Sequence, residues 1–276
     1  MRTATPTVPR DGPPVRPETV TKLLVFIEEN HSLNQMRSGM PYTFGLARRF
    51  GYATDYRAIR HPSLPNYIAI AGGQTYGITN DASPSFNPVH GRSVFGQAVA
   101  SGRTAAAFVD GMSRNCATSN GGSGYAVKHN PWAYFTHERD LCQRYDVPVD
   151  RLGAAITEGS LPTVGMVVPN LCHDAHDCPL GTADAWFEGW MSKIFDGPDW
   201  KSGHLAVVLT ADEDDGSGTN GVLTVVIHPS QRAHVVTSRL THFSLTRLYS
   251  EVAGMPYLYE AASAPSIATA FGLPLK

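Results

Sequence analysis

The sequence has no uninterrupted apolar run near the ~18 residues of a membrane-spanning helix, so no membrane span is expected. It also lacks an excess of basic residues: 22 Lys and Arg stand against 24 Asp and Glu, a formal net charge of −2. Proteins that bind nucleic acid or anionic membranes usually carry a positive patch, so neither partner is expected. With 276 residues, 42% of them hydrophobic, the chain is long and apolar enough for one large α/β domain.

The first 20 residues, MRTATPTVPRDGPPVRPETV, place prolines and charges where a secretory signal would have an apolar segment. We expect residues 1–21 to form a flexible arm. We also expect a cytoplasmic protein, or a secreted one if its N-terminus has been trimmed. The four cysteines permit two disulfides, although a chain of this size does not need them. The spacing of Cys172 and Cys178 is not that of a zinc knuckle.

Segments rich in apolar and β-branched residues alternate with segments of helical periodicity. The buried strands predicted by this pattern are 23–27, 104–109, 163–168, 204–210 and 221–227. Helices are predicted at 93–102, 182–195 and 241–254, the last with Thr241 as its N-cap and Gly254 at its end. This alternation predicts an α/β fold, with a mostly parallel sheet and helices on both faces, in one domain over 22–276. Residues 110–160 lack periodicity and are expected to form a long loop or a cap.

Acidic and imidazole side chains follow three of the predicted strands. Ligands bind beyond the carboxyl ends of strands in open parallel sheets, so these groups are expected at one edge. Close carboxylates repel unless a cation neutralises them or their pKa values rise. The sequence therefore predicts a divalent metal: Mg, Ca or Mn if oxygens dominate, Zn or Fe if imidazoles join. Three separate solvated acidic loops are the alternative. The groups concerned are Glu28–His31, His173, Asp174, His176, Asp177 and Asp212–Asp215.

Residues 60–73, RHPSLPNYIAIAGG, place Ser63 between two prolines at the start of an apolar segment. Pro62 and Pro65 stiffen the turn, and the following residues can begin a helix whose N-terminus would face an anion. A nearby cation would lower the pKa of the Ser63 hydroxyl, and Asn66 could donate to a phosphoryl oxygen. No G-x-S-x-G elbow is present, which disfavours a serine hydrolase. A capping serine in a proline turn remains the alternative.

Six motifs, taken together and in order, resemble one family. They are EENHS, HPSLPNYIAIAGG, YAVKHNPWAYF, PN followed by HDAHD, ADAW and TADEDDG. This order is similar to the phosphoesterase family of bacterial acid phosphatases and phospholipases C in the alkaline phosphatase superfamily, and most of all to its mycobacterial secreted acid phosphatase group. The resemblance covers about residues 22–272. It implies an alkaline-phosphatase-like three-layer sandwich.

The resemblance also implies roles for particular residues. Ser63 would be the phosphorylated nucleophile and a metal ligand, with His176 or His129 as the proton donor to the leaving oxygen. The other metal ligands would be Glu29, Asn30, Asp212 and Glu213. The substrate-binding residues would be Lys128, Asn130 and Asp177. From the residues alone, Asn66 is also expected to bind substrate. His61 is expected to bind substrate by steering the Ser63 turn, with a structural histidine beside a proline as the alternative. The number of metals and the role of Asp174 stay open.

We therefore predict a metal-dependent phosphatase that hydrolyses a phosphate monoester through a phosphoserine, on a small phosphorylated metabolite or biosynthetic intermediate. A phosphodiesterase or phospholipase C would use the same site but needs room for a second ester group. A non-catalytic phosphate- or metal-binding relative is the third possibility. Sulfatase chemistry is disfavoured because Ser63 lacks the C/S-x-P-x-R context of formylglycine formation. The leaving group and the oligomeric state are not predicted.

Overall fold

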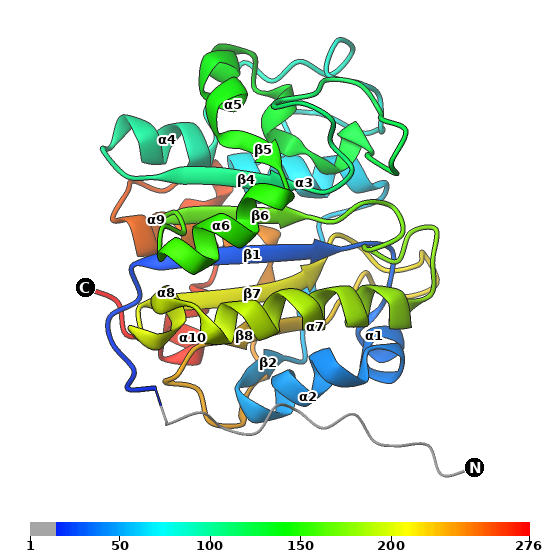
Figure 1. The fold of residues 1–276 in the computed structure, drawn as a ribbon. Coiled ribbons are helices and arrows are strands. Elements are labelled where there is room, and N and C mark those ends of the chain that lie inside the picture. The colour runs from blue at the N-terminus through cyan, green and yellow to red at the C-terminus, as the bar shows by residue number, and fades with distance from the viewer. Residues whose placement is uncertain (1–14) are drawn as a thin grey trace.

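The computed structural model describes residues 15–276, and its main feature is an eight-stranded sheet of order β5-β4-β6-β1-β7-β8-β2-β9 (Figure 1). All five predicted strands are present: β1 (Lys22–Glu28), β4 (Ala105–Val109), β6 (Val164–Val168), β7 (Leu205–Ala211) and β8 (Thr224–Ile227). Three short strands of this sheet were not predicted from the sequence: β2 (Gly51–Ala53), β5 (Asp146–Pro148) and β9 (His234–Val236). A separate small sheet pairs β3 (Tyr56–Arg57) with β10 (Leu240–Thr241).

The middle of the large sheet is parallel, as predicted. Strand β1 lies between β6 and β7 and pairs in parallel with both, so that Leu24 is opposite Gly165 on one side and Val207 on the other. Every residue of β1 after Lys22 is buried, because helices cover both faces and leave no face for polar side chains. The carboxyl ends of β6, β1 and β7 therefore meet at one edge of the sheet.

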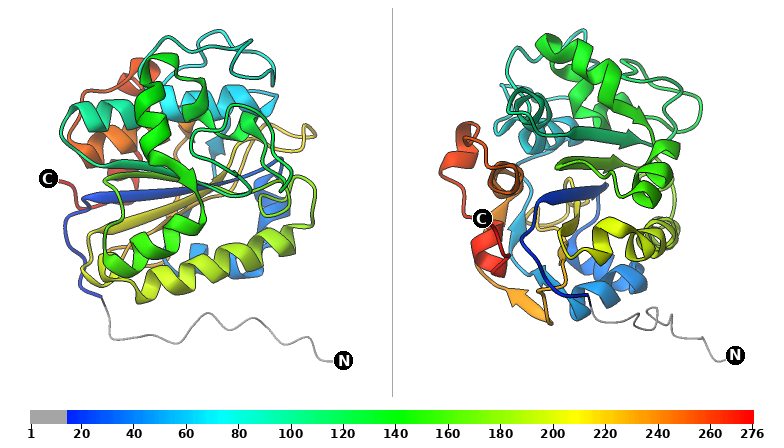
Figure 2. Two further views of the ribbon diagram at one scale, coloured as in Figure 1. Left: turned by 45° about the horizontal axis from the view of Figure 1, so that its top comes forward. Right: turned by 60° about the vertical axis from the view of Figure 1, so that its left-hand side comes forward.

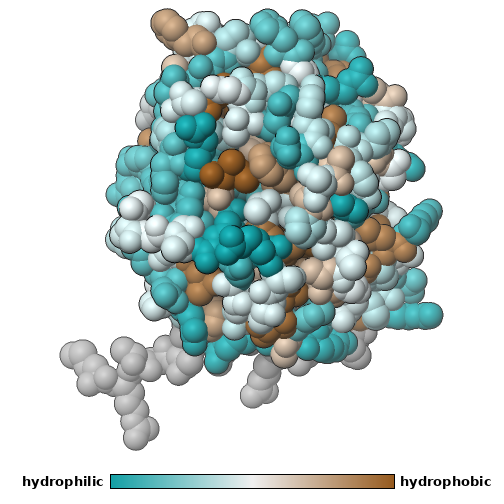
Figure 3. Space-filling model, turned by 180° about the vertical axis from the view of Figure 1, so that it is seen from behind, coloured by the Kyte–Doolittle hydropathy of each residue, from teal (hydrophilic) through white to brown (hydrophobic). Residues whose placement is uncertain are grey.

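Helices form a layer on each face of the sheet (Figures 1 and 2). One layer contains α1 (Leu33–Gly39), α2 (Pro41–Arg49), α6 (Asp150–Glu158), α7 (Leu180–Asp196) and α8 (Pro198–Lys201). The other contains α3 (Ser63–Gly72), α4 (Val94–Ala100), α9 (His242–Ala253) and α10 (Ile267–Phe271). The predicted three-layer α/β architecture is confirmed. Over the layer that contains α9 and α10, apolar residues are interspersed among hydrophilic ones at the surface (Figure 3).

The three predicted helices correspond to α4, α7 and α9. Helix α9 begins after Thr241, which forms a capping box, and ends at Gly254 in the left-handed conformation. The expectation of a loop over 110–160 holds only in part. Three 3-10 turns occur there, η1 (Val127–His129), η2 (Pro131–Tyr134) and η3 (Thr136–Glu138), and α5 (Arg139–Tyr145), β5 and α6 follow them.

The predicted N-terminal arm lies partly outside the described residues, which begin at residue 15. Its remaining part, 15–21, has no regular secondary structure, yet main-chain hydrogen bonds from Glu18 to Gly203 and from Val20 to Pro274 hold it against the domain. Among residues 15–276, each helix is too short or too polar to cross a bilayer. The four cysteines form two disulfides, Cys116–Cys142 and Cys172–Cys178.

Candidate active site

The carboxyl ends of β6, β1 and β7 carry the three polar clusters to one edge, as the sequence predicts. Backbone hydrogen bonds tie these ends together: Glu29 N–H donates to Asp174 O at 2.8 Å, and Asp212 N–H donates to Glu28 O at 2.9 Å. The main-chain N–H of Asn30 also donates to Asp212 Oδ1, at 3.2 Å. The carboxylates that follow β1 and β7 are thus held side by side on a rigid frame.

Ser63 is the first residue of α3, and only 1% of it is exposed. Its Oγ donates to Glu29 Oε2 at 3.1 Å and accepts from Lys128 Nζ at 3.2 Å. Every residue of α3 is buried, so the apolar helix fixes the hydroxyl against the sheet edge. Ser63, Glu29 and Lys128, which the sequence analysis assigned to one site, are therefore in contact. An anion beside Ser63 would also lie at the N-terminus of a ten-residue helix, where the helix dipole is favourable.

His129 lies between two carboxylates in the interior. Its Nε2 is 2.9 Å from Glu29 Oε1, and its Nδ1 is 3.1 Å from Asp174 Oδ2. Among residues 15–276, neither ring nitrogen has a hydrogen-bond partner, so both contacts are described as ion pairs. Burial favours the neutral imidazole, but the charges of Glu29 and Asp174 outweigh it and raise the pKa of His129 to about 9. The imidazolium and Lys128 in turn overcome the burial of Glu29 and hold its pKa at about 2.

Asp212 is fully buried and only partly satisfied. Its Oδ1 accepts from the main-chain N–H groups of Asn30 and Glu213, whereas Oδ2 has no hydrogen-bond partner. Burial and the charges of Glu29 and Glu213 raise the pKa of Asp212 well above its ordinary value. Burial likewise raises the pKa of Glu213 to about 7. This part of the site therefore has more negative charge than its own cations balance.

A divalent cation fits this donor set. The unpartnered Asp212 Oδ2 and the nearby Glu29 carboxylate are hard oxygen donors, which suit Mg, Ca or Mn. These two carboxylates alone, however, do not form a complete set of metal ligands. Among residues 15–276, the one group of three Cys, His, Asp or Glu ligand atoms within 4.8 Å of one another is Cys116, Cys142 and Asp146, and its sulfurs are joined in a disulfide. A cation at the sheet edge would also need the Ser63 hydroxyl or ligands from outside the protein.

Two residues predicted to bind substrate, His61 and Asn66, contact the acid Glu213. The two ring nitrogens of His61 lie 3.2 Å from Glu213 Oε2 and 3.2 Å from Asp214 Oδ1. The amide of Asn66 donates to Glu213 Oε2 and to Arg60 O, and its oxygen accepts from the main chain of residues 59 and 60. The amide of Asn66, which we had assigned to a phosphoryl oxygen, is thus used within the protein.

The K-H-N sequence at residues 128–130 divides between two environments. Lys128 and His129 contact the site, but Asn130 is buried away from it and donates to Asp146 Oδ2 at 2.8 Å and Tyr125 Oη at 3.1 Å. The prediction that Asn130 binds substrate is not supported by this placement, which makes it an anchor of the loop. Burial raises the pKa of its partner Asp146 to about 7.

His176 and Asp177 lie at the open side of the site. The Nδ1 atom of His176 is 2.7 Å from Asp177 Oδ1, and 31% of the His176 side chain is exposed. The His176 ring lies 6.0 Å from that of His129. Asp174, whose role was left open, accepts from His176 N–H at 2.8 Å and so links this loop to His129. The disulfide Cys172–Cys178 closes the loop.

One residue that contacts this site was not predicted from the sequence. Asp81, in the loop between α3 and α4, accepts from Leu64 N–H at 2.9 Å and from Lys128 Nζ at 3.3 Å. In the sequence it stands in the stretch TNDAS, which is typical of a turn, and nothing in that pattern indicates a contact with a residue so distant in the chain.

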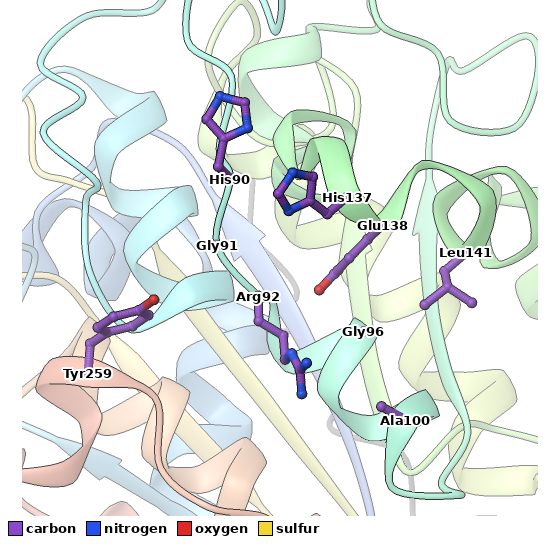
Figure 4. Close-up of a pocket in the computed structure, with 9 residues that line it drawn as sticks. All are labelled: His90, Gly91, Arg92, Gly96, Ala100, His137, Glu138, Leu141 and Tyr259. Atoms are coloured by element: carbon purple, nitrogen blue, oxygen red, sulfur yellow. The ribbon is translucent and has the colours of Figure 1, made fainter.

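A separate hollow of about 430 Å³ lies beside α4 and η3 (Figure 4). Its walls include His90, Arg92, His137, Glu138 and Tyr259. None of the predicted site residues lines it. The Glu138 carboxylate accepts hydrogen bonds from Ser93 and Trp132. This hollow is therefore separate from the candidate site around Ser63.

The phosphoesterase family profile matches residues 22–218, a range that includes every predicted site residue. A phosphatidylinositol-3-phosphatase from Mycobacterium tuberculosis is 28% identical over 260 residues, covering 92% of this chain and 84% of that protein. A phosphate-repressible acid phosphatase from Penicillium chrysogenum is 28% identical over 236 residues, 77% of this chain and 54% of that protein, so the chain spans about half its length.

A solved structure of an alkaline phosphatase superfamily protein from Vibrio parahaemolyticus superposes with a TM-score of 0.60. It covers 90% of this chain and 71% of that one, at 12% identity. At this identity the likeness concerns the fold alone, and it confirms the alkaline-phosphatase-like architecture expected from the motifs.

Proposed function

The chain belongs to the phosphoesterase family and is a phosphoric ester hydrolase, and from that premise we propose that it cleaves phosphate monoesters through a covalent phosphoserine on Ser63. The observation that carries the proposal is the placement of the Ser63 hydroxyl. It is buried at a helix N-terminus, between the carboxylate of Glu29 and the ammonium group of Lys128. A serine placed only to cap a helix would not need both charged partners.

In the first step, Ser63 Oγ attacks phosphorus and the bond from phosphorus to the leaving oxygen breaks. The hydroxyl already donates to Glu29 Oε2, so its proton has an acceptor in place. Lys128 Nζ, which is 3.2 Å from Ser63 Oγ, is within reach of the phosphoryl oxygens and balances their charge. A divalent cation, when bound by Glu29, Asp212 and Ser63 with Asn30 and Glu213 beside them, would favour the ionised serine.

The leaving oxygen must gain a proton. His129 is buried and is held as an imidazolium between two carboxylates, which suits charge balance better than proton transfer to a departing group. His176 is partly exposed and is oriented by Asp177, so we assign the proton donation to His176. In the second step, water attacks the phosphoserine, inorganic phosphate leaves, and Ser63 regains its proton.

The proposed substrate is a monoester of a small phosphorylated alcohol, such as a metabolite or a biosynthetic intermediate. A phosphoinositide 3-phosphate is a second candidate, because the relative that bears that activity in its name aligns over 92% of this chain. Both are monoesters and would use the same step at Ser63. A phosphodiesterase of the phospholipase C kind would accept a second ester group and is the competing reaction.

The test compares three substrates with the purified protein: a chromogenic phosphate monoester, the matching bis-ester, and a phosphoinositide 3-phosphate. We expect monoester hydrolysis to exceed bis-ester hydrolysis and to be lost in Ser63→Ala. Faster turnover of the bis-ester would favour the diesterase. If no substrate is hydrolysed faster than by Ser63→Ala, the protein is a phosphate-binding relative without catalytic activity.

The two disulfides also bear on where the protein works. Disulfides form and persist in oxidising compartments and are rare in the cytosol. We therefore propose that the protein with Cys116–Cys142 and Cys172–Cys178 paired acts in an oxidising compartment rather than in the expected cytoplasm. Alkylation of free thiols in protein isolated from its source tests this proposal, and reactive cysteines in the native protein would contradict it.

A further inference from the structure

Helix α3, which carries Ser63, lacks a capping side chain of its own. Its N-cap is Pro62, and no side-chain hydrogen bond closes the first turn from that position. Proline has no side-chain oxygen to accept from the free N–H groups of a first helical turn. The missing acceptor comes from the loop between α3 and α4 (cyan in Figure 1), where Asp81 Oδ1 accepts from Leu64 N–H at 2.9 Å.

The second oxygen of the Asp81 carboxylate pairs with the ammonium group of Lys128. Asp81 Oδ2 lies 3.3 Å from Lys128 Nζ, which also donates to Ser63 Oγ at 3.2 Å. Lys128 has two such polar partners in the described part of the chain. Without Asp81, Lys128 would keep one hydrogen bond, to the serine hydroxyl that has to react, and the attraction of the Glu29 charge.

One carboxylate thus joins the two segments that must meet for the reaction. They are the first turn of α3 with the attacking oxygen, and η1 with the ammonium group. They are 65 residues apart in the chain. The side chain of Asp81 is 31% exposed, so its pairing with Lys128 is not forced by burial. The placement of both oxygens is specific.

We infer that Asp81 is a positioning residue for phosphoryl transfer, which holds Lys128 against Ser63 and fixes the start of α3. The inference rests on the proposed function, since Lys128 is given its role there. Asp81 acts through Lys128 and need not touch the substrate.

The test is a double-mutant cycle on kcat/KM for a chromogenic phosphate monoester, with Asp81→Asn, Lys128→Met and the double variant. The asparagine side chain keeps an oxygen for Leu64 N–H but loses the charge that holds Lys128. We expect Asp81→Asn to lower kcat/KM about tenfold, the scale of one hydrogen bond between charged groups. In the Lys128→Met background the same change should have almost no further effect, because positioning energy is lost only once.

Asp199 provides a matched control. Its Oδ1 is 2.5 Å from Lys22 Nζ and its Oδ2 accepts from Leu161 N–H at 3.0 Å. It therefore makes the same pair of contacts as Asp81, but with Lys22 at the opposite end of β1. Asp199→Asn should lower the unfolding temperature without changing kcat/KM of the remaining folded protein.

The outcomes separate the two claims. If Asp81→Asn and Lys128→Met lower kcat/KM additively, or if Asp81→Asn leaves it unchanged in a folded, active protein, the role of Asp81 is refuted. If the wild-type protein is no faster than Ser63→Ala, the proposed function is refuted, and the role of Asp81 with it. Thermal unfolding of each variant shows whether the protein measured is folded.

Discussion

Replacing the buried acid Asp146 with asparagine should remove a large pH-dependent term from the stability of the protein. Asp146 has no exposed surface, and its Oδ2 accepts from Asn130 at 2.8 Å. Burial favours its neutral form and raises its pKa from 3.8 to about 7, against the hydrogen bond from Asn130 and the charge of Arg139. Asparagine resembles this neutral form and keeps an oxygen for Asn130.

The direction of this pH dependence follows from the linkage between proton binding and folding. The folded protein binds the proton of Asp146 more tightly than the unfolded chain does, so this contribution to stability is fully present below pH 3.8. It declines as the pH rises and is lost once the pH passes about 7. A pKa change from 3.8 to about 7 corresponds to about 4 kcal/mol as an upper bound, at about 1.4 kcal/mol for each pH unit.

The measurement is thermal unfolding of wild type and Asp146→Asn between pH 4 and pH 8. Near pH 4 the two should unfold at similar temperatures. Toward pH 8 the variant should become the more stable by several degrees, since about 1 kcal/mol moves the midpoint by about 2–4 °C in a chain of this size. Asp215→Asn is the control: hydrogen bonds from Ser217 lower the pKa of this exposed acid, so its effect has the opposite sign. A constant difference between wild type and Asp146→Asn across this range would refute the reasoning.

Three further outcomes are expected. Lys128→Met should lower kcat/KM by about two powers of ten, because a charge that faces the transferring group is lost, and steady-state kinetics with a phosphate monoester would show this; an unchanged rate would contradict it. A chelator should abolish activity and a divalent cation restore it, with elemental analysis as the check, and full activity in metal-free protein would contradict the cation site. Replacing the cysteines of Cys116–Cys142 with serines should lower the free energy of unfolding by about 3.5 kcal/mol, and replacing those of Cys172–Cys178 should lower it by about 2.2 kcal/mol, because the first disulfide spans 26 residues and the second spans 6. Denaturant titration at equilibrium would show which loss is larger, and a larger loss for Cys172–Cys178 would contradict this account.

The position of the site could be predicted because parallel strands place their carboxyl ends together. That rule required only that the strands ending before Glu29, Asn170 and Asp212 be recognised, and their apolar runs were long enough for this. The family resemblance assigned Ser63 and Glu29 to one metal site, and in the structure Ser63 Oγ lies 3.1 Å from Glu29 Oε2. Short strands such as β5 and β9, with three residues each, give too little periodicity to be recognised.

The roles of individual side chains were harder to predict, because neighbours in a motif need not face the same way. Residues 128–130 lie in and just after a 3-10 turn, where successive side chains point about 120° apart. Lys128 therefore reaches Ser63 while Asn130 turns back to Asp146. The role of Asn66 could not be predicted for the same reason. Its amide group donates to a main-chain carbonyl and to Glu213, and its position at the start of a helix does not indicate these partners. The hydrogen bond from Lys128 to Asp81 depends on a loop path that no local pattern specifies.

The most direct test of the account is to trap the covalent intermediate. Protein mixed with a rapidly reacting phosphate monoester and quenched in acid should carry one phosphoryl group on the peptide that contains Ser63, as mass spectrometry would detect, and Ser63→Ala should carry none. A phosphoryl group on another residue, or rapid hydrolysis by Ser63→Ala, would contradict it.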